Sequence, residues 1–196
     1  MRIIAGEFRG RTIKAPKGEG TRPTTDRVRE SVMSAVNSAR GGFDGAVVLD
    51  AFAGSGALGL EALSRGAAAA HFYERDGVAL RALCDNVRTL GLPTQRARIH
   101  RADVLKDAPV YVRPAFDVVF FDPPYAFGAA DVLGMAAALN TAGALDPKVL
   151  VVYEHVATSC DAVDTAAAAC GFVLASRKKY GDTVVDIMRS KEPSQL

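Results

Sequence analysis

The sequence predicts an α/β fold in which a mostly parallel sheet of seven strands ends in an antiparallel hairpin. From about residue 46 onward, short apolar runs alternate with segments whose apolar residues recur at helical spacing. Apolar strands that alternate with helices are typical of a parallel sheet covered on both faces. Residues 172–180 and 183–188 flank Gly181 and Asp182, which predicts the closing hairpin. The chain has 196 residues, enough for one domain with a small extension.

The individual elements follow from the same periodicities. Before the closing hairpin, strands are predicted over residues 46–50, 69–74, 98–101, 116–121 and 149–154. Helices are predicted over residues 57–65, 77–90, 128–139 and 159–170. Ahead of this series, residues 2–5 and 11–14 predict a small N-terminal β-hairpin. Thr24 or Thr25 can then cap a helix that runs to about Ala39.

Positive charge gathers at the N-terminal end of the chain. Residues 1–29 carry a net charge of +5, whereas the remaining residues sum to −3. A basic end on a mildly acidic body indicates a surface that faces phosphates, although a solvated terminus without a partner would have the same composition. The candidate phosphate contacts are Arg2, Arg9, Arg11, Arg22 and Arg27. Arg22 and Arg27 could instead pair with Asp26 or Glu30 and dock the first helix.

The composition excludes several classes of protein. Hydrophobic residues make up 49% and charged residues 23%, which is ordinary for a globular protein. No apolar run approaches the roughly 20 residues of a membrane helix, and the N-terminus has no secretory signal pattern. Cys84, Cys160 and Cys170 lack the spacing of a disulfide framework or a zinc site. We therefore expect a cytoplasmic monomer that uses neither a membrane nor a metal.

A glycine-rich turn follows the strand at residues 46–50 and predicts a nucleotide site. Gly54, Gly56 and Gly59 formally match the pattern of a dinucleotide-binding turn. Asp50, just before the turn, would repel a pyrophosphate but would suit the sulfonium and amino groups of S-adenosylmethionine. The predicted cofactor contacts in this turn are Asp50, Phe52, Ala53, Gly54, Ser55, Gly56 and Gly59.

Two further carboxylates follow the next two strands. Glu74, with Arg75 after it, lies where a carboxylate can bind both ribose hydroxyls, as it also does in NAD sites. Asp103 lies where it can accept a hydrogen bond from an adenine amino group, with Val104 beside it. Helix caps and solvated loop acids would look the same in sequence.

The sequence Asp122-Pro123-Pro124-Tyr125 follows an apolar strand and predicts the catalytic loop. Neither proline has an N–H, so the strand must end there on a rigid backbone. An exocyclic base amine is a poor nucleophile because its lone pair is delocalised into the ring. Hydrogen bonds from this amine to Asp122 and to the Pro123 carbonyl would localise the lone pair, and Tyr125 would stack on an unstacked base.

With these motifs together, the chain resembles the class I, Rossmann-like methyltransferases, and more narrowly the bacterial 16S ribosomal RNA guanine-N2 methyltransferases of the RsmD type. The narrower resemblance rests on residues 2–6 (RIIAG), 9–11 (RGR), 22–30 (RPTTDRVRE), 50–56 (DAFAGSG) and 122–125 (DPPY), and it spans essentially the whole chain. It implies methylation of one guanine N2 in 16S rRNA, within assembled small subunits, with S-adenosylmethionine as the methyl donor. It also implies that the N-terminal hairpin and residues 22–30 help to hold RNA.

Two alternatives remain open on the sequence. A DNA adenine-N6 methyltransferase can carry the same Asp-Pro-Pro-Tyr sequence, but such enzymes usually have a sizeable target-recognition domain, and no insertion of that size is present. A noncatalytic nucleotide-binding or RNA-binding module would not need the Asp-Pro-Pro-Tyr sequence at all.

Overall fold

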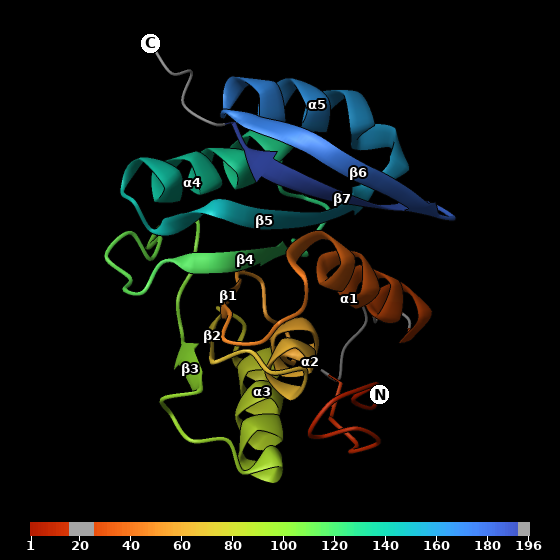
Figure 1. Cartoon of the computed structure of the whole chain (residues 1–196), viewed down its shortest axis with the longest axis vertical. Coiled ribbons are helices and arrows are strands. Elements are labelled where there is room, and N and C mark those ends of the chain that lie inside the picture. The colour runs from red at the N-terminus through yellow and green to blue at the C-terminus, as the bar shows by residue number, and fades with distance from the viewer. Residues whose placement is uncertain (16–25, 192–196) are drawn as a thin grey trace.

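Seven strands form one sheet in the order β3-β2-β1-β4-β5-β7-β6 in the computed structural model, which describes residues 1–15 and 26–191 (Figure 1). The strands are β1 (Val47–Asp50), β2 (Ala69–Tyr73), β3 (Ala97–His100), β4 (Phe116–Phe121), β5 (Leu145–Val156), β6 (Phe172–Tyr180) and β7 (Thr183–Ser190). β1 to β5 run parallel, and β7 runs antiparallel to both β5 and β6. The predicted fold class is confirmed.

Helices cover both faces of the sheet (Figure 1). They are α1 (Asp26–Arg40), α2 (Ala57–Ser64), α3 (Gly77–Leu90), α4 (Ala129–Thr141) and α5 (Cys160–Ala169), with a short 3₁₀ turn at Ala157–Ser159. α1, α2 and α3 pack on one face, and α4 and α5 pack on the other. The predicted caps Thr24 and Thr25 lie outside the described residues.

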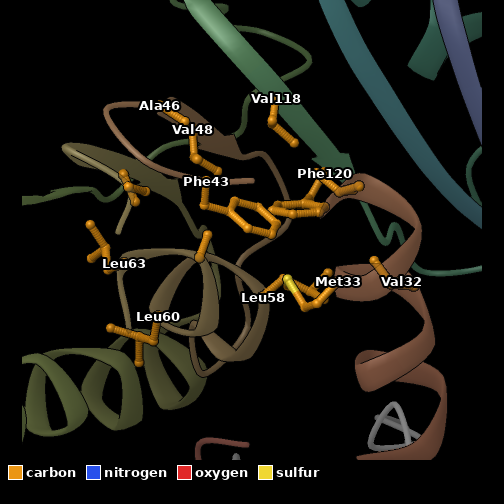
Figure 2. Packing of buried hydrophobic residues seen from close by; sticks show 14 of the residues in the cluster. Val32, Met33, Phe43, Ala46, Val48, Leu58, Leu60, Leu63, Val118 and Phe120 are labelled. Atoms are coloured by element: carbon orange, nitrogen blue, oxygen red, sulfur yellow. The ribbon is translucent and has the colours of Figure 1, made fainter. Parts of the chain in front are cut away.

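Two apolar clusters, one on each face, explain why the central strands are continuously hydrophobic. Val118 and Phe120 of β4 point to the first face, whereas Val119 and Phe121 point to the second. Figure 2 shows Phe120 against Phe43, close to the side chains that α1 and α2 contribute. Side chains at successive strand positions alternate between faces, so a strand covered on both sides must be apolar throughout.

β5 is longer than predicted. It begins at Leu145 rather than near Val149, and it therefore includes Pro147. Its pairing with β4 shifts between Phe116–Leu145 and Val118–Leu150, so residues 146–149 lie at an irregularity. A proline is tolerated there because its missing N–H removes no ladder hydrogen bond.

The N-terminal hairpin is shorter than a pair of full strands, with one antiparallel bridge between Arg2 and Thr12. It is held against α2 by buried polar side chains. Glu61 accepts hydrogen bonds from the backbone of Ile4 and Ala5, at 2.8 and 3.0 Å. Ser64 accepts one from the backbone of Phe8, at 2.9 Å. The hairpin therefore packs on the main body through a defined set of hydrogen bonds.

Candidate active site

Four strand ends build the candidate site. Because β1, β2, β4 and β5 are parallel neighbours in the sheet, their carboxyl ends lie at one edge. Open α/β sheets bind ligands at this edge, where the loops leave the strands. The acidic side chains at these ends are Asp50, Glu74, Asp122 and Glu154. The structure thus brings together carboxylates that are up to 104 positions apart in the sequence.

The glycine-rich turn after β1 is shaped by its glycines and by Asp50. Gly54 and Gly56 adopt φ values of 55° and 84°, which favour glycine. The buried Asp50 carboxylate accepts a hydrogen bond from the Gly59 N–H at 2.9 Å. A Cβ at Gly59 would collide with the ring of Phe72, so only glycine lets α2 approach the sheet this closely.

The Asp50 carboxyl, just before the turn, has a raised pKa. Burial raises its pKa to about 7, the Gly59 hydrogen bond opposes this rise, and the charges of Asp122 and Glu74 add to it. A cationic ligand group next to Asp50 would stabilise its ionised form, whereas an anionic group would destabilise it.

The carboxylate of Glu74 binds the turn from the neighbouring strand. It accepts hydrogen bonds from the backbone N–H of Gly54 at 2.8 Å and of Asp76 at 2.6 Å. Nearby, Arg75 forms an ion pair with Asp103 at 3.0 Å. Asp103 also accepts from the Leu105 backbone at 3.2 Å, and the next residue, Val104, is buried. All predicted cofactor residues therefore lie in loops at this edge, except Asp50, which ends β1, and Gly59, which lies in α2.

Three aromatic side chains lie together near the carboxyl ends of the central strands. The Phe52 ring lies 5.8 Å from the Phe127 ring and 6.3 Å from the Phe121 ring, measured between centroids. The Arg75 guanidinium lies over the Phe127 ring, 5.0 Å from its centroid. Phe52 thus connects the glycine turn to the loop after β4, and Ala53 and Ser55 of the same turn are buried.

The Asp-Pro-Pro-Tyr sequence begins where β4 ends and leads into a turn. The Pro124 carbonyl accepts a hydrogen bond from the Phe127 N–H at 3.0 Å. Tyr125 is 55% exposed, an unusual fraction for a large aromatic residue beside a buried sheet. Pro123, Pro124 and Tyr125 line a cavity of about 240 Å³ together with residues at the end of β5 and just after it.

One carboxylate at this edge was not singled out from the sequence. Glu154, on β5, lines the same cavity as Tyr125. Burial and the charge of Asp122 raise its pKa to about 8. The signal was available, because Glu154 lies near the end of an apolar strand, as Asp50 does.

The predicted phosphate contacts differ in their surroundings. Arg2, Arg9 and Arg27 are exposed. Arg11 is exposed too, but it donates a hydrogen bond to the Thr89 carbonyl of α3 at 2.6 Å. Arg22 lies outside the described residues. Arg29, which contributes to the basic charge of the N-terminal end, is buried and donates to the Arg2 carbonyl at 2.5 Å, so its charge does not face a phosphate there.

Each of the three histidines contacts a neighbouring side chain in the fold. The rings of His71 and His100 stack 5.7 Å apart, and His155 contacts Asp186 at 3.0 Å. Within residues 1–15 and 26–191, no group of three or more histidines, cysteines or carboxylates could hold a metal ion. Over the same residues, no helix is both long and apolar enough to span a membrane.

Known proteins resemble this chain in both sequence and fold. A family model described as Conserved hypothetical protein 95 matches residues 1–189. The Haemophilus influenzae protein named ribosomal RNA small subunit methyltransferase D is 41% identical over 134 residues, which cover 67% of each chain. The solved structure of yhhF from Escherichia coli has a TM-score of 0.80 at 30% identity and covers 97% of this chain and 98% of that one.

A more distant structure shares the fold alone. Magnesium protoporphyrin IX methyltransferase from Synechocystis PCC 6803, solved with bound SAM, has a TM-score of 0.66 at 13% identity. It covers 84% of this chain and 79% of that one. The chain belongs to the family described as Conserved hypothetical protein 95, and it is a methyltransferase related to the proteins named ribosomal RNA small subunit methyltransferase D.

Proposed function

We propose that the protein transfers a methyl group from S-adenosylmethionine to the exocyclic N2 amine of a guanine in 16S rRNA of the small ribosomal subunit. The observation that carries this proposal is the position of Asp50 and Asp122 at the ends of two adjacent parallel strands. One carboxylate follows the pattern of a cofactor site and the other begins the Asp-Pro-Pro-Tyr loop. A methyl donor and its acceptor would thus meet at one edge of the sheet.

The residues around the glycine turn fit S-adenosylmethionine. Asp50 is a buried carboxylate whose raised pKa favours a cationic neighbour, as the α-amino and sulfonium groups would be. Glu74 keeps lone pairs for ribose hydroxyls beyond its two backbone hydrogen bonds. Asp103 and Val104 supply an acceptor and an apolar wall for the adenine. When bound, S-adenosylmethionine supplies a methyl carbon whose bond to sulfur breaks as the bond to nitrogen forms, and the electron pair stays on sulfur.

The residues of the Asp-Pro-Pro-Tyr loop prepare the amine. Asp122 and the Pro123 carbonyl accept hydrogen bonds from the two N2 protons, which localises the nitrogen lone pair and directs it at the methyl carbon. Tyr125 stacks on the guanine, which its exposure to solvent allows. Transfer leaves one proton too many on N2, and Asp122 is placed to receive it. Positioning of the two reactants accounts for much of the rate gain.

The name of the Haemophilus influenzae relative supports a ribosomal RNA substrate. We infer that residues 1–23 form an RNA-contacting extension, supported by the exposure of Arg2 and Arg9. Arg11 and Arg27 would add to this contact, and the assigned Arg22 contact stays a prediction. A ribosomal substrate would place the reaction in the cytoplasm.

The test is transfer of labelled methyl from S-adenosylmethionine to small ribosomal subunits from a strain that lacks the enzyme. Nucleoside analysis of the RNA should give labelled N2-methylguanosine. Labelled N6-methyladenosine would retain the chemistry but contradict the assigned base. No label on subunits, free rRNA or DNA would contradict the proposed activity as a whole.

A further inference from the structure

Glu154 lies beside the Asp-Pro-Pro-Tyr loop, on the neighbouring strand. β4 and β5 are parallel, with Phe121 opposite Tyr153, so Asp122, the first residue after β4, follows beside Glu154 of β5, and its charge acts on the Glu154 carboxyl. Both side chains also fall on the same face of the sheet. Phe120 and Val152, two positions earlier, belong to the cluster under α1 and α2. Strand alternation then places the two carboxyls on that face.

A cavity lies at this point, between the Asp-Pro-Pro-Tyr loop and the end of β5. It has a volume of about 240 Å³ and is lined by Pro123, Tyr125 and Glu154 among others. Glu154 is half-buried, and its charged neighbour is Asp122. Among the described residues, no hydrogen bond donor to the Glu154 carboxyl is seen. Such a group can either accept a hydrogen bond from a ligand as a carboxylate or donate one as a carboxylic acid.

Purines that carry an amine at the same position can differ in whether the neighbouring ring nitrogen has a proton, and a carboxylate can distinguish the two. In guanine, the N2 amine has the N1–H beside it, which is a donor. In 2-aminopurine the amine is at the same position, but N1 has no proton and is an acceptor. A carboxylate next to N1 therefore favours guanine, because it would meet the lone pair of a bare N1 without a proton between them.

We propose that Glu154 is a specificity-determining residue whose carboxylate accepts the guanine N1–H while Asp122 holds the neighbouring N2 amine. This inference rests on the proposed function, because it assigns a second contact to the same base. Carboxylates from the ends of two adjacent strands would then accept hydrogen bonds from the N1–H and the N2 amine of one guanine. Burial and the charge of Asp122 raise the pKa of Glu154, and a hydrogen bond from the guanine N1–H would favour the ionised form and lower that pKa.

The experiment compares two bases at one position. Small subunits are reconstituted with 16S rRNA that carries either guanine or 2-aminopurine at the nucleotide that the wild-type protein methylates. Methyl transfer is measured at pH 8.5, because burial and the charge of Asp122 raise the pKa of Glu154 and a higher pH favours its ionised form. We expect the wild-type kcat/KM to be at least about 10-fold lower on 2-aminopurine, because a buried acceptor loses its donor.

The variant Glu154→Gln tests the inference through the ratio of its kcat/KM values on guanine and on 2-aminopurine. Its amide can accept from the guanine N1–H or donate to the bare N1 of 2-aminopurine, so the preference should shrink to within about threefold. Turnover on guanine should fall about 10-fold, because a charge-assisted hydrogen bond becomes a neutral one. Glu154→Asp keeps a carboxylate and should retain the preference for guanine. Asp146→Asn removes a carboxylate from the far end of the same strand and should behave like wild type.

The outcomes distinguish a failure of this inference from a failure of the proposed function. Equal losses on both bases with Glu154→Gln, leaving the wild-type preference intact, would give Glu154 a merely structural role and overturn the inference. If Glu154→Gln is unstable, loss of the preference in Glu154→Asp would overturn it as well. A wild-type protein that forms no N2-methylguanosine would instead contradict the proposed function.

Discussion

The two halves of the candidate site are built in different ways. In the cofactor half, backbone N–H groups already hold the carboxylates: Gly59 donates to Asp50, and Gly54 donates to Glu74. In the base half, Tyr125 is 55% exposed and Glu154 has a pKa of about 8. The fold itself arranges the carboxylates of the first half, whereas in the second half a ligand with an aromatic face and a hydrogen bond donor would complete the surroundings of Tyr125 and Glu154. Substitutions in the two halves should therefore have separable effects on binding and transfer.

The largest effect is expected from Asp122→Ala in the base half. It removes the acceptor that would hold the amine and receive its proton, so methyl transfer should fall by about 10³-fold or more, as when other reaction-specific electrostatic contacts are lost. S-adenosylmethionine affinity, measured by calorimetry, should stay within about threefold of wild type because the turn after β1 is intact.

The control for Asp122→Ala is Asp131→Ala, which removes an exposed carboxylate from the first turn of α4. It should leave both measurements unchanged. Appreciable turnover by Asp122→Ala would remove Asp122 from the mechanism, and an equal loss of cofactor affinity would erase the distinction between the two halves.

Asp50→Asn tests the cofactor half. The ionised carboxylate should bind the cationic cofactor, so wild-type affinity should fall as the pH drops through about 7 and Asp50 takes up a proton. Asp50→Asn should weaken binding by about 10- to 100-fold at pH 8, a charge-assisted hydrogen bond being lost, and should remove the pH dependence. Calorimetric titrations from pH 6 to 8.5 check both results. An unchanged pH dependence in the variant would place the titrating group elsewhere.

The same substitution should stabilise the ligand-free protein. The pKa of Asp50 is raised from 3.8 to about 7 on folding, so its stabilising contribution is present at low pH and is lost as the pH rises through about 7. At pH 8 the buried charge opposes folding, and Asp50→Asn should raise the unfolding free energy by about 2 kcal/mol. The gain should be smaller at pH 5. Thermal unfolding without ligand at the two pH values measures it, and destabilisation at pH 8 would show that the Gly59 contact needs the charge.

Tyr125→Ala returns to the base half and should act on the substrate alone. Loss of stacking on the base should lower kcat/KM by about 10-fold, since stacking contributes roughly 1–3 kcal/mol per base. Tyr125→Phe should retain most of the activity, because the ring is what stacks. Folding and cofactor affinity should not change in either variant, because the side chain is largely exposed. A loss in Tyr125→Phe equal to that in Tyr125→Ala would assign the role to the hydroxyl instead.

The sequence singled out every carboxylate that gathers in the cofactor half but missed Glu154 in the base half, for a physical reason. Glycine turns and strand-end carboxylates are local, so Asp50 and Glu74 could be located from their own segments. Glu154 gains its setting from Asp122, which is 32 positions away and adjacent only through strand pairing. Arg29 was counted in the basic charge of the N-terminal end, because charge alone does not reveal that Glu61 lies 3.9 Å away in the interior.

The smallest effect is expected at the periphery, where the hairpin meets solvent. Arg9 is exposed, whereas Arg11 is fastened to the Thr89 carbonyl, so Arg9→Ala isolates one phosphate contact without disturbing the docking of the hairpin. Removing one such contact should weaken RNA binding a few-fold and lower the slope of log affinity against log salt by about 1. Lys148→Ala removes an exposed cation from the amino end of β5 and should leave the slope unchanged. An unchanged slope in Arg9→Ala, or a parallel drop in cofactor affinity, would mean that the basic hairpin supports the fold rather than the nucleic acid.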